Sequence, residues 1–150
     1  MISLLDINVL VALAWPNHVH HEPAHRWFRK ARSEGWATCP VTQTGFVRVS
    51  SNDRVLPDAR PPAEALAVLE RIIRVPGHVF WSDDTSLCTS RFVSRRRLIG
   101  HRQVMDAHLL ALALARGGRL ATFDRGVLEI VPDSVPADRA AYVIPASKPG

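Results

Sequence analysis

The chain has 150 residues, a length at which a single domain buries a full hydrophobic core without disulfides or a structural metal. Hydrophobic residues make up 47% of it and charged residues only 22%, a composition that excludes intrinsic disorder. The formal net charge is +5, and Lys30 and Lys148 are the only lysines among 19 basic residues. Because the planar arginine side chain suits phosphate and carboxylate groups, this charge admits a nucleic acid or an acidic protein as partner.

Secretion and membrane insertion find no support in the sequence. The N-terminal segment carries Asp6 inside its first apolar run and lacks the basic region of a signal peptide. No stretch approaches the roughly 18 apolar residues of a membrane span. Cys39 and Cys88 are too few for a disulfide framework, and we expect two reduced, partly buried thiols. We therefore expect a cytoplasmic protein with no membrane contact.

Short apolar runs alternate along the chain with amphipathic helical segments. The expected strands are residues 2–5, 36–39, 78–81, 119–123 and 141–144. The expected helices are 9–14, 23 to the residues before Gly35, 42–50 with Thr42 as N-cap, 65–73, and 104–116 closed by Gly117. We expect a loop over 52–62 and a frayed tail up to Gly150. This alternation predicts an α/β fold with a parallel sheet of four to five strands flanked by helices.

Three aspartates occupy special positions in this pattern. Asp6 ends the first strand and Asp124 ends the fourth, and ligands of open parallel sheets bind outside those strand ends. Asp106 lies in the first turn of an otherwise apolar helix, near the positive end of the helix dipole. Taken singly, each aspartate is explained as a turn or capping residue. Together they predict an acidic cluster that repels itself unless a cation is bound.

Oxygen ligands of this kind favour a hard cation, Mg²⁺ or alternatively Mn²⁺, over zinc. Such an ion polarises a phosphodiester and lowers the pKa of a bound water. We therefore take Asp6, Asp106 and Asp124 as the candidate metal ligands and catalytic residues.

Four segments make the chain recognisable: LLDINVLVALAW, VTQTGFVRVSSN, HRQVMDAHLLALA and LATFDRG. In this order and spacing they closely resemble a PIN domain, and more narrowly the toxin subunit of a VapBC-type toxin–antitoxin pair. The resemblance runs from Ile2 to about Gly126, and we expect residues 1–150 to form a single PIN domain. It implies a PIN-like parallel sheet, Mg²⁺-dependent endoribonuclease activity on structured RNA (transfer or ribosomal), a small cognate antitoxin, and a homodimer.

The resemblance also assigns supporting roles. Asn8 and Thr122 match polar neighbours of the acidic residues, which orient the ligands or their waters. Where many relatives carry a glutamate, this chain has Gln43, whose amide oxygen can ligate a metal but brings no charge. Met105 stands where a threonine often precedes the apolar helix. The first departure leaves a second metal ion open, and the second removes a hydroxyl.

Arginines supply the candidate RNA contacts. Arg96, Arg97 and Arg102 precede the Asp106 helix, and Arg48 and Arg125 lie beside motif positions. A solvated loop explains the arginine run equally well. The aromatic residues Trp15, Trp27, Phe28 and Trp81 fit core or interface stripes better than base-stacking platforms, because they lie on amphipathic faces. His21 and His25, four residues apart, admit zinc but lack a third ligand motif.

Two other classes of protein compete with a metal-dependent nuclease. A phosphoacceptor domain or a haloacid-type phosphatase also places aspartates at strand ends, but each needs a lysine near them, and neither lysine is suitably placed. A P-loop is absent from the sequence. The alternative from outside the enzymes is a non-catalytic PIN-like module that binds RNA or protein, which Gln43 keeps open.

Overall fold

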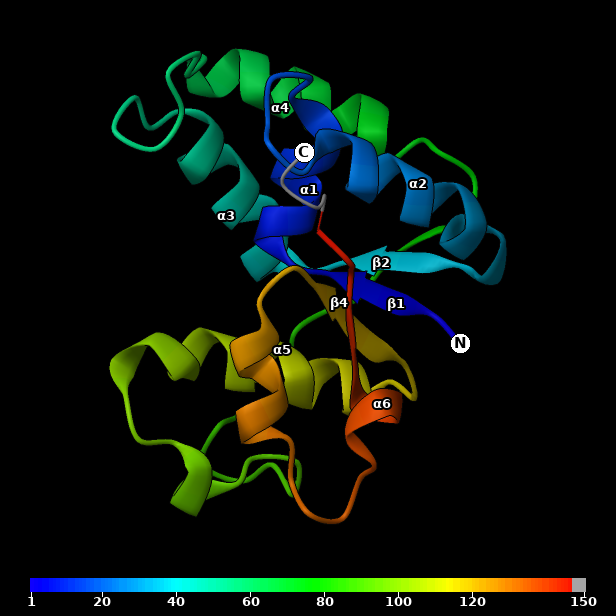
Figure 1. Ribbon diagram of the computed structural model, residues 1–150, viewed down its shortest axis with the longest axis vertical. Coiled ribbons are helices and arrows are strands. Elements are labelled where there is room, and N and C mark those ends of the chain that lie inside the picture. The colour runs from blue at the N-terminus through cyan, green and yellow to red at the C-terminus, as the bar shows by residue number, and fades with distance from the viewer. Residues whose placement is uncertain (147–150) are drawn as a thin grey trace.

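A five-stranded, all-parallel sheet forms the centre of the computed structural model, which describes residues 1–146 (Figure 1). The strands are β1 (Ser3–Leu5), β2 (Trp36–Thr38), β3 (His78–Phe80), β4 (Arg119–Thr122) and β5 (Ala141–Val143), in the spatial order β3-β2-β1-β4-β5. The predicted α/β fold and parallel sheet are therefore confirmed. The expectation for the tail up to Gly150 falls partly on residues 147–150, outside the described part of the chain.

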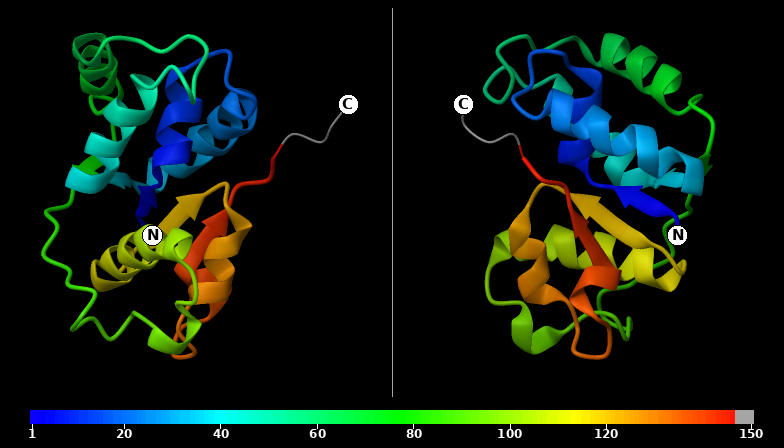
Figure 2. Two further views of the ribbon diagram at one scale, coloured as in Figure 1. Left: turned by 90° about the vertical axis from the view of Figure 1, so that its left-hand side faces the viewer. Right: turned by 45° about the vertical axis from the view of Figure 1, so that its right-hand side comes forward.

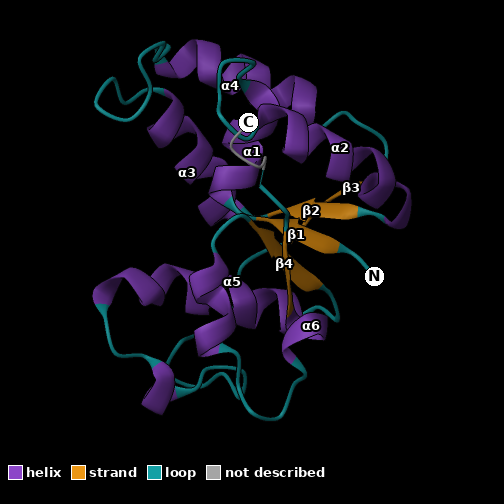
Figure 3. Cartoon of the chain, viewed as in Figure 1, coloured by secondary structure: helices purple, strands orange, loops and turns teal. Residues whose placement is uncertain are grey.

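Helices cover both faces of the sheet. They are α1 (Ile7–Ala14), α2 (His21–Ala31), α3 (Pro40–Ser50), α4 (Pro62–Ile72), α5 (Val104–Ala115) and the short α6 (Ala137–Ala140). The first four lie on one face and the last two on the other, as the secondary-structure colours show clearly (Figure 3). Each layer buries its own apolar cluster against the sheet (Figure 2). This double cover explains why β1, β2 and β4 are almost wholly buried, whereas Val79 and Phe80 of the edge strand β3 are exposed.

The start of α1 differs from the prediction and bears on the site. The helix begins at Ile7, two residues earlier than expected, because Asp6 is its N-cap. The Asp6 Oδ1 atom accepts a hydrogen bond from the Ile7 backbone N–H at 2.7 Å. Asp6 thus ends β1 and starts α1 without a connecting loop, which fixes its carboxylate at the strand end.

The predicted N-cap of α3 is wrong. The helix starts at Pro40, since proline is tolerated at the first helical position, and Cys39 precedes it as N-cap. Thr42 lies in the first turn, where its hydroxyl accepts a hydrogen bond from the Cys39 N–H at 3.0 Å. Cys39 is buried, whereas Cys88 lies exposed in a turn, so the expectation of partial burial fails for both thiols.

Helix α5 is enclosed on nearly all sides. Seven of its twelve residues are buried, and the polar positions are confined to its first turns. Gly117 ends it with a positive φ of 73°, the left-handed conformation that glycine adopts without cost. The chain then enters β4 directly. The apolar body of α5 therefore holds Asp106, in the first turn, against the carboxyl end of the sheet.

No helix within residues 1–146 has the length and apolar character that crossing a membrane requires.

Close packing of α1 against α3 generates a prediction. A Cβ atom built on Gly45 would lie 2.2 Å from Ile7 Cδ1, so a side chain there must push the two helices apart. We expect Gly45→Ala to lower the free energy of unfolding by about 1–3 kcal/mol, measured by urea denaturation. Gly100→Ala is the matched control, because no atom lies within 4 Å of its added Cβ. Equal stability of the two variants would contradict this packing.

Candidate metal and nuclease site

The sheet brings two of the three candidate aspartates together. Strands β1 and β4 are parallel neighbours, with Leu5 opposite Ala121, so their carboxyl ends lie side by side. Asp6 follows Leu5 directly, and Asp124 comes three residues after Ala121. Asp6 is almost completely buried, whereas Asp124 is exposed. The two residues therefore lie at the same edge of the sheet, Asp6 buried and Asp124 exposed.

The Thr122 hydroxyl forms hydrogen bonds with three polar groups at this edge of the sheet. It donates to Asp6 Oδ2 at 2.7 Å and accepts from the Asn8 side-chain amide at 3.2 Å. It also accepts from the Asp124 backbone N–H at 3.1 Å. Because Thr122 is buried, no water replaces these partners. One side chain thus orients Asp6 and positions the backbone that carries Asp124.

Asn8 completes the link between α1 and β4. Its amide nitrogen donates to Thr122, and its Oδ1 atom accepts from the Phe123 N–H at 3.3 Å. Both ends of the amide are used, so its orientation is fixed by the backbone and by Thr122. Asn8 and Thr122 are therefore both hydrogen-bonded within the group around Asp6, and their role in supporting a metal stays a prediction.

Asp106 shares the electrostatic environment of the other two aspartates. Burial and, to a smaller extent, the negative charges of Asp6 and Asp124 together raise its pKa to about 7. Burial likewise raises the pKa of Asp6, against the opposing effect of hydrogen bonds from Thr122 and Ile7, while the charge of Asp124 adds to the rise. Repulsion between the carboxylates thus contributes to both shifts: Asp124 acts on Asp6, and Asp6 and Asp124 act on Asp106. That the three aspartates together bind a cation stays a prediction.

The arrangement is open. Within residues 1–146, no three His, Cys, Asp or Glu side chains are close enough to enclose a metal ion. Asp124 Oδ1 accepts from the Gly126 N–H at 2.8 Å, which holds that carboxylate at the rim. Mg²⁺ keeps several waters and is held through one or two carboxylates, so it does not need a closed set of protein ligands. The donors present are carboxylate oxygens, the kind that hard divalent cations prefer.

Gln43 belongs to a different polar cluster. Its amide nitrogen donates to Thr38 Oγ1 at 3.0 Å, and that hydroxyl also contacts His78 Nε2 at 2.7 Å. Burial lowers the pKa of His78, which favours the neutral imidazole, and its Nε2 atom can then accept a hydrogen bond from the Thr38 hydroxyl. The Gln43 amide is thus engaged at the end of β2, and it shares no hydrogen bond with the aspartates in the described residues.

The five candidate RNA-contacting arginines fall into two groups. Arg96 and Arg97 both form ion pairs with Asp133, which lies beyond β4. Arg48, Arg102 and Arg125 are exposed, and within residues 1–146 none of them makes an ion pair. An exposed ion pair contributes little to stability, so a phosphate can compete with Asp133 for its arginines.

The histidines near the start of α2 have structural partners. His21 Nδ1 and His25 Nε2 contact the backbone oxygens of Ala12 and Leu13, at 2.7 and 2.8 Å. These carbonyls lie in the last turn of α1, where they lack helical partners. The zinc interpretation is thereby replaced by C-terminal capping of α1.

One neighbour of the site was missed by sequence reasoning. The ring of His20 stacks on that of Phe123, with centroids 4.7 Å apart. His20 therefore contacts the residue that precedes Asp124 in the chain. His20 and Phe123 are separated by about two thirds of the chain, and no local pattern in the sequence signals their contact.

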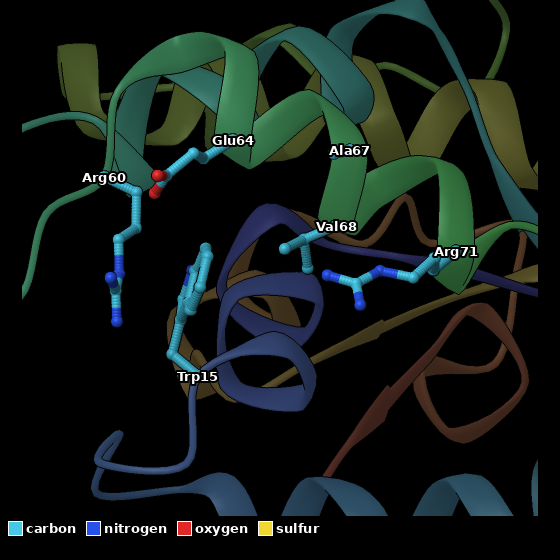
Figure 4. Close-up of a pocket in the computed structure, with 6 residues that line it drawn as sticks. All are labelled: Trp15, Arg60, Glu64, Ala67, Val68 and Arg71. Carbon is cyan, nitrogen blue, oxygen red and sulfur yellow. The ribbon is translucent and has the colours of Figure 1, made fainter.

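A separate pocket of about 310 Å³ lies between the end of α1 and α4. Trp15 forms one wall, Val68 points toward its ring, and Arg60 and Arg71 flank it (Figure 4). The indole is held by stacking on Phe46 and by a 2.9 Å hydrogen bond from its N–H to Ser50. None of the lining residues is one of the three aspartates or of their hydrogen-bond partners, so this pocket is separate from the acidic residues.

Comparison with known proteins agrees with the geometry. Residues 3–132 match the family model described as PIN domain. The chain is 49% identical over 129 residues to ribonuclease VapC39 of Mycobacterium tuberculosis, covering 86% of this chain and 93% of that protein. It is 51% identical over 128 residues to ribonuclease VapC38 of the same organism, covering 85% and 89%. For ribonuclease VapC44 the identity is 45% over 133 residues, covering 88% and 93%.

A parallel sheet with acidic residues beyond the carboxyl ends of two neighbouring strands, together with a match to the family model over most of the chain, defines the class as a PIN domain. Within that class, the extent of these identities places the chain in the family of VapC ribonucleases.

The Thr122 hydroxyl offers the first prediction for the site. Thr122→Val keeps the side-chain shape but leaves Asp6 and the Asp124 N–H without their partner. We expect it to lower the free energy of unfolding by about 1–3 kcal/mol, whereas Thr122→Ser, which retains the hydroxyl, changes stability far less. Denaturant unfolding of both variants measures the difference. Unchanged stability in the Val variant, or a loss in the Ser variant as large as that in the Val variant, would contradict a dominant role of the hydroxyl.

The raised pKa of Asp106 predicts a pH-dependent response to metal. In the unfolded chain the group has its ordinary pKa of 3.8, and in the folded protein about 7. Its stabilising contribution without metal is therefore complete below the lower value and is lost as the pH rises through the higher one. We expect Mg²⁺ to raise the melting temperature more at about pH 8 than at about pH 5, where Asp106 is protonated.

Asp106→Asn is the control for this measurement, because it removes the titrating group and should remove most of the pH dependence. A Mg²⁺ effect of the same size at both pH values in the unmodified protein would show that the ion binds away from Asp106.

Proposed function

We propose that the protein is a Mg²⁺-dependent endoribonuclease that acts in the cytoplasm as the toxin of a type II toxin–antitoxin pair, with Mn²⁺ as an alternative ion. Asp6, Asp106 and Asp124 are the proposed metal ligands and catalytic residues, on a single PIN domain. The observation that carries the proposal is that Asp6 and Asp124 follow the ends of two neighbouring parallel strands, with Asp106 near enough that their charges add to the effect of burial on its pKa. Such a cluster is stable at neutral pH when a cation offsets its charge.

Each residue has a distinct part in this proposal. Asp6 supplies the fixed carboxylate, since the Thr122 hydroxyl and the Ile7 N–H orient both of its oxygens. Asp106, with a pKa of about 7 before an ion binds, gives up its proton when one does. Asp124 closes the site from its exposed rim. Mg²⁺, when bound, supplies Lewis-acid polarisation of the phosphodiester and activation of a water.

RNA is the proposed substrate because of the surrounding charge. The net charge of +5 resides almost wholly on arginines, whose forked donors bind phosphate. Arg102 and Arg125 flank the acidic residues in sequence and are exposed, and Arg48 is exposed on α3. Arg96 and Arg97 are a further phosphate site if RNA displaces Asp133. We propose a structured RNA, transfer or ribosomal, as the target.

The proposed partners are a small cognate antitoxin and a second copy of the chain. Both rest on the resemblance of the sequence motifs to VapBC-type toxins. The half-exposed Trp15 pocket between α1 and α4 supports a protein partner on the face that carries α1–α4.

Cleavage of RNA by the purified protein tests the proposal. We expect cleavage with Mg²⁺, its loss on adding EDTA, and its recovery on restoring the metal. Because metal assistance is worth several kcal/mol in the transition state, Asp6→Asn should reduce the rate by about a hundredfold or more. Asp53→Asn is the matched control, since Asp53 is exposed in the loop before α4.

Equal rates in the Asp6→Asn and unmodified proteins would overturn the metal-site assignment. RNA binding without cleavage of any cellular RNA, with or without metal, would favour the non-catalytic PIN-like module.

A further inference from the structure

A stacked aromatic pair lies on the surface between α2 and the edge strand β5. The rings of Trp27 and Tyr142 are nearly parallel, 18° apart in plane, with centroids 6.1 Å apart. Both side chains are half-exposed. Trp27 is thus only partly buried against the core, whereas its helix neighbour Phe28 is buried.

Cations surround this pair. The guanidinium of Arg119 lies 4.9 Å from the centre of the Tyr142 ring, in a cation–π contact. A pocket of about 170 Å³ opens beside the two rings, and its lining adds Arg26 and Lys30 from α2. No acidic side chain lines the pocket, and within residues 1–146 none of the three cations forms an ion pair. The site therefore offers flat aromatic surface and uncompensated positive charge together.

The aromatic pair is linked through β4 to the residue before Asp124. Tyr142 stands opposite Ala121 in the β4–β5 register. Phe123 follows two residues after Ala121, just beyond the end of β4. Phe123 and Tyr142 both pack against the apolar cluster that lies under α1–α4. At the start of α2, His20 stacks on Phe123, next to Asp124. From His20 to Trp27 the helix rises by about 10 Å.

Two aromatic pairs thus lie along α2. His20 stacks on Phe123 at the start of the helix, next to Asp124, and Trp27 stacks on Tyr142 about two turns further on. In Figure 2, β5 and the chain that follows it run beside the layer that contains α2. A single strand of nucleic acid presents a planar base and a phosphate at each step, which this alternation of rings and cations matches.

We propose that the pocket formed by Trp27, Tyr142, Arg26 and Lys30 binds a nucleotide of single-stranded RNA flanking the cleaved phosphodiester. The base stacks on the aromatic pair, and the phosphate is held by the α2 cations. The position of this nucleotide relative to the cut rests on the proposed nuclease function, whereas the binding itself does not. A loop or an unpaired end of a structured RNA is the substrate class that supplies such a nucleotide.

Binding of a fluorescein-labelled oligouridylate to the full chain in EDTA tests the pocket independently of cleavage. We expect Tyr142→Ala and Trp27→Ala to weaken binding about five- to a hundredfold without altering its salt dependence. Lys30→Ala should instead lower the log–log salt slope by about 0.7. Tyr142→Phe, which keeps the ring, is the control and should bind as the unmodified protein does.

Photo-cross-linking of the unmodified protein to the same RNA carrying 4-thiouridine covers the case of an alanine variant that does not fold. We expect cross-links in peptides that contain Trp27 or Tyr142. Unchanged affinity in folded alanine variants, or cross-links confined to other peptides, would overturn the proposal. The proposal would also be overturned if the alanine variants lost their affinity for an acidic peptide but kept their affinity for RNA. That result would assign the pocket to a protein partner.

The two proposals fail in different ways. If the unmodified protein cleaves RNA and Tyr142→Ala binds oligouridylate with unchanged affinity, the pocket proposal is wrong and the nuclease proposal stands. If binding depends on the pocket but the unmodified protein cleaves no RNA, the nuclease proposal is wrong and the pocket proposal stands.

Discussion

The hydrogen bond from the Thr122 hydroxyl to Asp6 joins the ends of two neighbouring parallel strands, and the rest of the site is arranged around it. It exists because β1 and β4 are adjacent in register, which places the residues after Leu5 and Ala121 within reach of each other. Through the same oxygen, Thr122 receives the Asn8 amide and the Asp124 backbone N–H. A single buried hydroxyl therefore couples the sheet, the first turn of α1 and the loop that carries Asp124.

The second constraint is electrostatic. Folding places the carboxyl groups of Asp6 and Asp106 out of water and near Asp124, and the raised pKa values of the first two express the resulting cost. A purely structural cluster would reduce that cost with arginine or lysine partners. Here, Asp6 is held by a hydroxyl and a backbone N–H, neither of which neutralises its charge. The structure thus retains a local excess of negative charge on a protein that is otherwise basic, which is the combination that a cation bridging protein and phosphate requires.

Sequence reasoning predicted the fold well because its signals are local. Apolar runs of a few residues mark the five strands, and the apolar segment with Gly117 at its end marks α5. Capping was harder to place. Asp6 is the N-cap of α1 and Thr42 lies inside α3, because a short polar residue near a helix start suits several capping positions equally.

Contacts between distant segments were beyond the reach of sequence patterns. The spacing of aspartates at strand ends indicated the acidic cluster, since parallel topology alone brings such ends together. Nothing local indicated that His20 stacks on Phe123, that Trp27 meets Tyr142, or that Asp133 pairs with Arg96 and Arg97. Likewise, the position of Gln43 in the chain did not reveal that Thr38 engages its amide. These pairings follow from strand order and loop paths, which are properties of the whole chain.

Anomalous diffraction from crystals of the protein grown with Mn²⁺ at neutral pH tests the central claim most directly, because it locates the ion without reference to activity. The account predicts a strong peak among the carboxylates of Asp6, Asp106 and Asp124, and its disappearance in Asp106→Asn crystals. A peak elsewhere, such as beside His21 and His25, with none at the three aspartates, would contradict it.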